Sequence, residues 1–251
     1  MTKRPLDGKI ALVTGAGQNI GRGIALRLAR DGAAIVVNGR SNRTTVDDTV
    51  NMVKSLGVPA MGCIADISDP AAVEEMADEI RSEFGGPDIL VSNAGLRRQT
   101  PFLGMDLAEW REILSVALDG AFILTRTLVP MMVERDSGAI VALSGVSHHL
   151  GTVERCHVSA SKAGLEGFIR SLSRELAPKG ITCNCVASGV IDTLRDASAG
   201  ARPPSGAVSN TPIGRLGRIE EIAETVRLLV GLHGGFTTGQ TIHVNGGAYL
   251  G

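Results

Sequence analysis

Aromatic residues are scarce in this chain of 251 residues, at 3% of the sequence, with one tryptophan and one tyrosine. Proteins that bind single-stranded nucleic acid usually stack the bases on aromatic side chains. The formal net charge of −1 also gives no general attraction to phosphate backbones or to anionic membranes. The composition therefore argues against nucleic-acid and membrane partners and favours a small molecule.

Long apolar runs are missing as well. No segment approaches the roughly 18 consecutive apolar residues of a membrane span, and the first residues lack the apolar core of a secretory signal. Neither CxxC pairs nor metal-ligand spacing occur among the four cysteines, Cys63, Cys156, Cys183 and Cys185. We expect a soluble, cytoplasmic protein with reduced, buried thiols and predict no metal site.

Short aliphatic runs alternate with helical patterns along the whole chain. The expected strands are residues 10–13, 35–37, 60–65, 89–91, 139–143, 181–186 and 241–244. The first expected helix carries Ile24 and Leu28 on one face. The other expected helices are residues 45–56, 71–84, 107–133 with a bend near Pro130, 156–177 and 220–230. This alternation predicts right-handed crossovers and a parallel sheet, and the continuous apolar strands predict helices on both faces.

The predicted fold class is therefore α/β: a single-domain, Rossmann-like, doubly wound parallel sheet of about seven strands over residues 1–251. One segment, residues 194–212, is irregular and contains three prolines. It is longer than most connections between secondary-structure elements. We expect a flap over a site there, with a surface insertion as the alternative.

Glycine is abundant, at 32 of 251 residues, against an average of about 7%. A glycine-rich loop over residues 14–21 follows the first expected strand and opens the first helix. Glycine permits positive φ and lets backbone amides approach a pyrophosphate at the positive end of a helix dipole. A strand, loop and helix in this order are typical of a dinucleotide-binding fold.

Five segments in register resemble the short-chain dehydrogenase/reductase family, and within it the members similar to 3-oxoacyl-ACP reductases. They are the TGxxxGxG-like loop of residues 14–21, Ser92-Asn93-Ala94-Gly95, Ser159-Ala160-Ser161-Lys162-Ala163-Gly164, residues 184–193, and Val244-Asn245-Gly246-Gly247. The resemblance covers essentially the whole chain. It implies hydride transfer between a nicotinamide cofactor and a carbonyl/alcohol pair.

The resemblance also implies a set of cofactor-binding residues. They are Gly15, Gly17, Gln18, Asn19, Ile20, Gly21, Arg40, Ser41, Asp66, Ile67, Asn93, Ala94, Gly95, Lys162, Gly189, Ile191 and Thr193. Asn19 stands where the family has glycine, but asparagine is the residue next most able to adopt left-handed geometry. Ser188 replaces the family's proline, a mild change.

The residue after the second expected strand discriminates between the two nicotinamide cofactors. An acidic side chain there binds the ribose 2′-hydroxyl of NAD, but this chain has Gly39 followed by Arg40. A guanidinium group suits the 2′-phosphate of NADP. NADP is therefore favoured over NAD, and the alternative is that Arg40 is a solvated loop charge.

The family's proton-handling side chains are missing. Aligning the motifs places its tyrosine, serine and asparagine at Val158, Gly145 and Ala117, none of which exchanges a proton through its side chain. Ser144 and Ser147 flank Gly145, so the register there is the least secure. Losing a general acid typically lowers a rate by about 10²–10⁴. Only Lys162 remains of this set.

Three functions stay open on these grounds. The first is an NADP-linked oxidoreductase whose proton comes from His148, His149, His157 or a bound water, since histidine titrates near neutrality. The second is a non-catalytic NADP-binding subunit or regulator, and the third a lyase or isomerase that reuses the pocket. The resemblance further implies a homotetramer, with a dimer as the next expectation.

Overall fold

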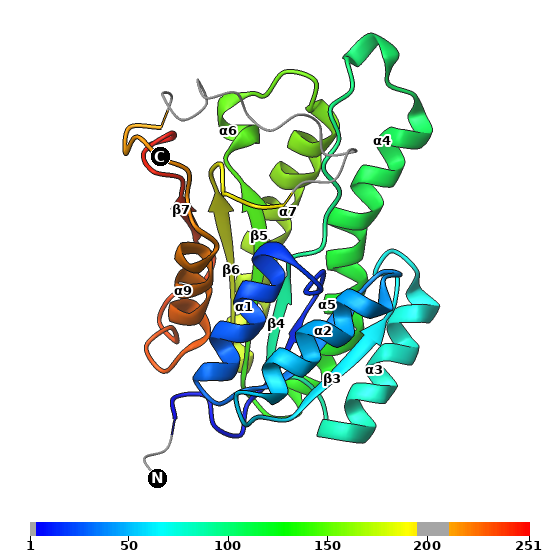
Figure 1. The fold of residues 1–251 in the computed structure, drawn as a ribbon, viewed down its shortest axis with the longest axis vertical. Coiled ribbons are helices and arrows are strands. Elements are labelled where there is room, and N and C mark those ends of the chain that lie inside the picture. Colours follow the sequence, from blue (N-terminus) through cyan, green and yellow to red (C-terminus); the bar gives the residue numbers. More distant parts are fainter. Residues whose placement is uncertain (1–3, 195–210) are drawn as a thin grey trace.

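A parallel sheet forms the centre of the molecule (Figure 1) in the computed structural model, which describes residues 4–194 and 211–251. Its strands are β1 (Ile10–Val13), β2 (Ala34–Gly39), β3 (Ala60–Ile64), β4 (Ile89–Ser92), β5 (Gly138–Gly145), β6 (Ile181–Ser188) and β7 (Thr241–Val244). Their order is β3-β2-β1-β4-β5-β6-β7, which reverses between β1 and β4. The predicted doubly wound fold is confirmed, and ligands of such sheets bind beyond the carboxyl ends of the strands at this reversal.

Helices cover both faces of the sheet (Figure 1). They are α1 (Asn19–Arg30), α2 (Arg43–Lys54), α3 (Pro70–Phe84), α4 (Leu107–Leu114), α5 (Gly120–Val133), α6 (Ser147–Leu150), α7 (Cys156–Leu176) and α9 (Ile219–Val230), with 3-10 turns at Phe102–Gly104 and Ala177–Lys179. Side chains of α1, α2 and α9 form the core on one face. Those of α3, α5 and α7 form the core on the other.

Successive residues of one strand enter different cores. Ala11 and Val13 of β1 belong to the core under α1, whereas Leu12 between them belongs to the core under α5 and α7. All three are fully buried. Side chains of a strand alternate between the faces of the sheet, so a sheet covered on both sides requires the unbroken apolar strands of this sequence.

The helix expected over residues 107–133 is present, with a π-helical turn (Ser115–Asp119) between α4 and α5. Pro130 lies inside α5, and the helix continues through it to Val133. Leu107–Val133 is long and apolar enough to cross a membrane by length and composition alone. Half of its most apolar stretch is buried inside the molecule, as in the core helix of a globular domain.

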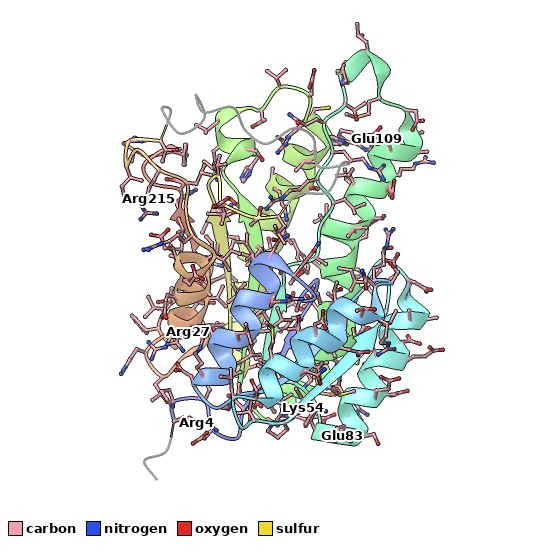
Figure 2. All side chains as sticks on the ribbon, viewed as in Figure 1. Arg4, Arg27, Lys54, Glu83, Glu109 and Arg215 are labelled. Atoms are coloured by element: carbon pink, nitrogen blue, oxygen red, sulfur yellow. The ribbon has the colours of Figure 1, made fainter. Side chains whose placement is uncertain are left out.

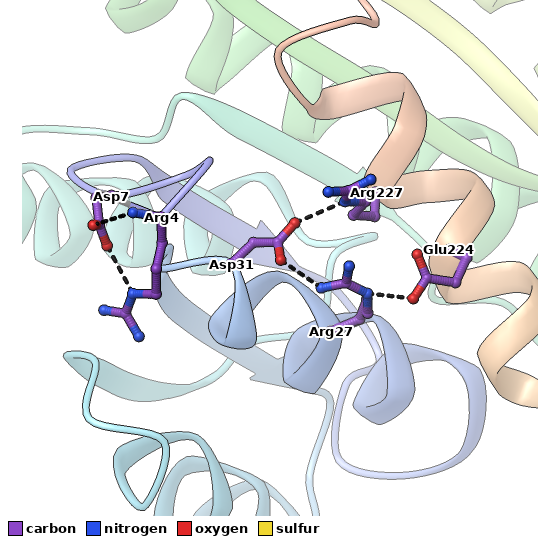
Figure 3. Close-up of polar contacts among 6 residues, drawn as sticks. All are labelled: Arg4, Asp7, Arg27, Asp31, Glu224 and Arg227. Carbon is purple, nitrogen blue, oxygen red and sulfur yellow. Dashed lines mark hydrogen bonds and ion pairs between the residues drawn. The ribbon is translucent and has the colours of Figure 1, made fainter. Parts of the chain in front are cut away.

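Ion pairs join the end of α1 to α9 (Figure 3). The Asp31 carboxylate accepts hydrogen bonds from Arg27 and from Arg227 of α9, both at 2.7 Å. Arg27 also pairs with Glu224 of α9. Burial alone would raise the pKa of Asp31, but the hydrogen bonds from Arg227 and Arg27 outweigh it and lower the pKa. Residues nearly two hundred positions apart in sequence are thus held together.

The four cysteines differ in their burial. Cys63, Cys183 and Cys185 are buried, and burial raises the pKa of each thiol to about 12. The prediction that all four thiols are buried is wrong for Cys156, which is exposed because it is the first residue of α7, at the surface end of that helix.

The flap expected at residues 194–212 falls mostly on residues 195–210, outside the described part of the chain.

Candidate cofactor cleft and active site

The loop between β1 and α1 has the backbone geometry of a phosphate cradle. Gly15 has φ +60°, and Asn19 has φ 51°, so asparagine does adopt the left-handed conformation at the position of the family's glycine. A Cβ on Gly21 would lie 2.4 Å from the carbonyl oxygen of Gly15. This close approach of two backbone segments is possible only for glycine.

The first turn of α1 has no side-chain cap. In contrast, side-chain oxygens of Asn42, Asp69 and Asp106 accept hydrogen bonds from backbone amides at the starts of α2, α3 and α4. Uncapped amides at a helix N-terminus attract an anion through both their hydrogen bonds and the helix dipole. The start of α1 therefore fits a pyrophosphate.

The Asn19 side chain also ties the loop to the far side of the cleft. Its Nδ2 donates to the carbonyl oxygen of Leu194 at 3.0 Å, and its Oδ1 accepts from the Leu194 amide at 2.9 Å. The glycine of the family pattern has no side chain for this contact. Asn19 thus fixes Leu194 across the cleft.

A second tie connects the loop to the residues after β4. The Thr14 hydroxyl accepts hydrogen bonds from the amides of Asn93 and Ala94 at 3.0 and 3.1 Å. Asn93 Nδ2 donates to the carbonyl oxygen of Thr14 at 2.8 Å. These bonds hold the two loops at the reversal of strand order against each other and set the width of the cleft.

The cleft lies along this line of loops. It is lined by Gly15, Gln18, Asn19, Ile20, Gly21, Asn38, Arg40, Ala65, Asp66, Ile67, Asn93, Ala94, Gly95, Leu96, Arg97, Val116, Thr193 and Leu194. Twelve of the predicted cofactor residues are in this set. Two others, Gly17 and Ser41, do not line it, and Gly17 instead packs against Thr45, which a Cβ on Gly17 would meet at 2.7 Å.

Arg40 lies at the end of the cleft beside Asp66. Burial alone would raise the pKa of Asp66, but hydrogen bonds from Ser68 and the positive charge of Arg40 lower it. Gly39, at the position of the acid in NAD-binding sheets, has no room for a side chain, since a Cβ there would lie 2.6 Å from Val46. Arg40 is exposed and lines the cleft, so it brings a positive charge to this stretch.

A second cavity continues from the cleft and shares Ile20, Asn93, Gly95, Leu96 and Arg97 with it. Its remaining lining residues are Gln99, Leu143, Ser144, Gly145, Val146, Ser147, Leu150, Thr152, Arg155, Val158, Lys162, Ser188, Gly189, Val190 and Ile191. The predicted residues Lys162, Gly189 and Ile191 lie here. We name this hollow the Lys162 cavity.

Lys162 projects from α7 to the end of β5. Its Nζ donates to the carbonyl oxygen of Leu143 at 2.5 Å and lies beside Gly95. Burial, and secondarily the positive charge of Arg97, lower the pKa of Lys162 to about 8. An amine with this pKa exchanges protons near neutral pH, unlike an ordinary lysine.

The three vacated positions lie around this cavity and the adjacent helix. Val158, one turn before Lys162 on α7, is 7% exposed and lines the cavity. Gly145 ends β5, and the nearest atom to a Cβ there is the Ser188 carbonyl oxygen at 3.7 Å, so space exists for a side chain. Ala117 is buried on the π-helical turn.

The three predicted histidines do not line the Lys162 cavity. His157 is fully buried, and its Nε2 lies 3.2 Å from Oε1 of Glu109 on α4, which Figure 2 labels. His148 and His149 of α6 instead lie beside Glu166 on α7. The only tyrosine, Tyr249, stacks on His149 and is absent from the residues that line the cavity.

Sequence reasoning missed several lining residues. Asn38, next to the last residue of β2, donates through its side chain to the Ala65 carbonyl oxygen at 3.1 Å, and Val116 lines the cleft from the π-helical turn. Leu194, the first residue of the expected flap, does line the cleft, but its contact with Asn19 was not predicted. No local motif marks these positions, because each depends on how two distant segments meet.

The sequence matches, over residues 15–249, the protein family described as Enoyl-(Acyl carrier protein) reductase. It is also similar to the 3-oxoacyl-[acyl-carrier-protein] reductases FabG of Salmonella typhimurium and Escherichia coli, each 38% identical over 244 residues, which cover 97% of this chain and 98% of the relative. FabG of Staphylococcus aureus is 37% identical over 243 residues, which cover 96% of this chain and 98% of the relative.

A Rossmann-like sheet with a glycine-rich loop after β1, an SNAG segment after β4 and a lysine on α7 is the architecture of a dinucleotide-binding α/β fold. The chain belongs to the short-chain dehydrogenase/reductase family, and its relatives are 3-oxoacyl-ACP reductases that it matches over nearly their full length.

Proposed function

We propose that this protein is an NADP-dependent oxidoreductase that acts on a carbonyl/alcohol pair with a non-standard proton donor. The observation that carries the proposal is the continuity of the dinucleotide cleft with the Lys162 cavity. A cofactor with its phosphates at α1 would have this hollow open to it as far as Lys162. The full-length similarity to reductases supports the same reaction class.

The residues present fit NADP. The amides at the start of α1 would hold the pyrophosphate, Arg40 the 2′-phosphate, and Lys162 the hydroxyls of the nicotinamide ribose. When bound, the cofactor supplies or accepts the hydride at the carbonyl carbon. Arg97 and Arg155 line the Lys162 cavity, so a substrate with an anionic group is favoured.

The proton donor best supported by this geometry is Lys162 Nζ. Reduction of a carbonyl makes an alkoxide, which requires a proton. Among the side chains that line the cavity, those with a permanent or exchangeable positive charge are Arg97, Arg155 and Lys162, and arginine does not deprotonate in proteins. The imidazole donors predicted from the sequence remain a hypothesis, with His148, His149 and His157 placed outside the cavity.

A second candidate function is a non-catalytic NADP-binding subunit or regulator. It is favoured by Ala117, Gly145 and Val158, which cannot exchange a proton through their side chains. We also propose a cytoplasmic location and a homotetramer, with a dimer next. Phe122 of α5 is 54% exposed and contacts Phe168 of α7, which gives these helices an apolar surface suited to self-association.

The test combines binding and turnover. Fluorescence titration compares NADPH with NADH, and we expect tighter binding of NADPH. NADPH consumption is then followed with carbonyl panels that include anionic compounds. At saturating cofactor, reduction should fall as pH rises through about 8, because the acid form of Lys162 is required, and alcohol oxidation should rise over the same range.

Lys162→Met should lower reduction by about 10²–10⁴ and remove the step near pH 8. Lys179→Met, at an exposed lysine, is the matched control and should leave both unchanged. Tight NADPH binding without reduction of any carbonyl or oxidation of any alcohol would contradict the proposed oxidoreductase activity. It would support the non-catalytic, NADP-binding function. Two results together would assign the donor to an imidazole. One is loss of turnover in the alanine variant of His148, His149 or His157, and the other is a pH step near 8 that persists in Lys162→Met.

A further inference from the structure

Two adjacent histidines face one buried carboxylate next to the Lys162 cavity. His148 Nε2 lies 3.3 Å and His149 Nε2 3.4 Å from the same oxygen, Oε2 of Glu166. Candidate ligand atoms of these three residues all lie within 4.8 Å of one another. They come from α6 and α7, so the fold, and no sequence motif, brings them together.

These separations are those of a metal coordination shell. In a tetrahedron with metal–nitrogen and metal–oxygen bonds of about 2.0–2.1 Å, neighbouring ligand atoms are about 3.3–3.4 Å apart. The two histidine–carboxylate distances match this edge. The distance between the two imidazoles is less constrained, and rotation of either ring adjusts it.

The surroundings hold the three side chains in place. Glu166 is 5% exposed, and its other oxygen, Oε1, accepts a hydrogen bond from the Ser144 hydroxyl at 2.7 Å. Tyr249 stacks on the His149 ring, with centroids 4.4 Å apart and planes 17° apart. Hydrogen-bonded carboxylates and fixed imidazoles are the outer-shell features that orient metal ligands.

The cluster is poorly satisfied without a cation. The Nε2 atom of His149, one of the three proposed ligand atoms, is buried and has no hydrogen-bond partner among the described residues. The His148 and His149 rings lie close together, with their centroids only 3.8 Å apart. A single divalent cation satisfies both imidazoles and the carboxylate at once.

We propose that His148, His149 and Glu166 form a zinc-binding site. Two imidazole nitrogens and one carboxylate oxygen are ligands that suit Zn²⁺, with water at the fourth position. His243 and Tyr249 pack against His149 and form the wall of the site. The site borders the Lys162 cavity, because Ser144 lines that cavity and bonds Glu166, but none of the three ligands lines it.

The test is a calorimetric titration of the full chain, stripped with chelator, with Zn²⁺ alone at neutral pH and without dinucleotide. We expect one ion per chain and a melting temperature that rises with zinc concentration. Glu166→Gln, which keeps the side-chain shape, and His149→Ala should each weaken binding by at least about 100-fold, since even outer-shell changes cost 10–100-fold. Co²⁺ should give the intense visible absorption of a tetrahedral site.

His233→Ala is the matched control, because His233 is exposed and outside the cluster, and zinc affinity should not change. Circular dichroism establishes that each variant is folded, and His149→Ala provides a second test at a less buried position if Glu166→Gln fails to fold. Wild-type affinity equal to that of His149→Ala, or a Co²⁺ spectrum typical of six oxygen ligands, would overturn the proposal. Since no cofactor or substrate is present, the result does not depend on the proposed reductase activity.

Discussion

At the residue scale, Val158 and Gly145 line the Lys162 cavity at the positions where the family pattern has hydroxyl-bearing side chains. Val158 lines the cavity one turn before Lys162, and Gly145 has open space around a Cβ. A tyrosine at the first position and a serine at the second would supply the hydroxyls that the family pattern contains. We expect Val158→Tyr with Gly145→Ser to raise kcat/KM for carbonyl reduction by about 10²–10⁴, measured by NADPH consumption on the same panel.

The control for this gain is Val153→Tyr, which adds a tyrosine at a valine that is 83% exposed and outside the cavity. It should leave the rate unchanged. If the double variant binds NADPH as tightly as the original chain but is no faster, a missing hydroxyl is not what limits the reaction. A large gain from an inactive starting protein would instead favour the non-catalytic function for the natural chain.

The sequence was a good guide to single residues only where a local pattern fixes their role. Gly15 and Asn19 were predictable, because their backbone geometry is required by one short loop. The partners of His148 and His157 were not. Whether an imidazole faces a cavity or a carboxylate depends on how α6 or α4 packs on α7, and no residue neighbouring a histidine in sequence encodes that packing.

At the scale of elements, we propose that the junction of β1 and α1 contributes most to the affinity for the cofactor. A Cβ on Gly21 would lie 2.4 Å from the Gly15 carbonyl oxygen and 2.6 Å from Asn93 Nδ2, so the loop must move to accept any side chain. Gly21→Ala should therefore weaken NADPH binding by about 10–100-fold, the value of one hydrogen bond to a charged group. Fluorescence titration measures this directly.

Gly167→Ala is the matched control for that substitution. Gly167 also lies in a helix, but no atom is within 4 Å of a Cβ built there. We expect unchanged NADPH affinity and a slight gain in stability, since alanine favours the helix. Equal affinities of the Gly21→Ala and original chains would mean that the loop does not hold the pyrophosphate.

Elements were predicted more accurately than contacts, for a physical reason. β1 and β7 begin and end at the predicted residues because buried strands are short apolar runs bounded by turns. The π-helical turn at Ser115–Asp119 was not predicted. It retains a helical pattern of apolar residues, so its altered hydrogen bonding leaves no signal in the sequence.

At the scale of the whole molecule, the ion pairs around Asp31 connect the first and last helices of the domain (Figure 3). α1 and α9 lie side by side on one face of the sheet and share a core. The Asp31 side chain is only 12% exposed, and it is bonded to both Arg27 and Arg227. Removing the carboxylate charge leaves these two arginines without their shared partner.

Asp31→Asn should lower the free energy of unfolding at neutral pH by about 1–3 kcal/mol, the usual cost of leaving such a partner unsatisfied. The pKa of Asp31 is lowered in the folded protein. Its contribution is therefore complete above the unfolded value of 3.8 and is lost as pH falls through the lower folded value.

Urea unfolding from pH 7 down to about pH 2 should show the difference between the two proteins shrinking once the pH falls below 3.8. Asp48→Asn, at an exposed aspartate of α2 outside the described ion pairs, should show no such trend. A stability difference that stays constant across this range would mean that the Asp31 carboxylate contributes through its shape and hydrogen bonding alone. The charge would then not be what holds α1 to α9.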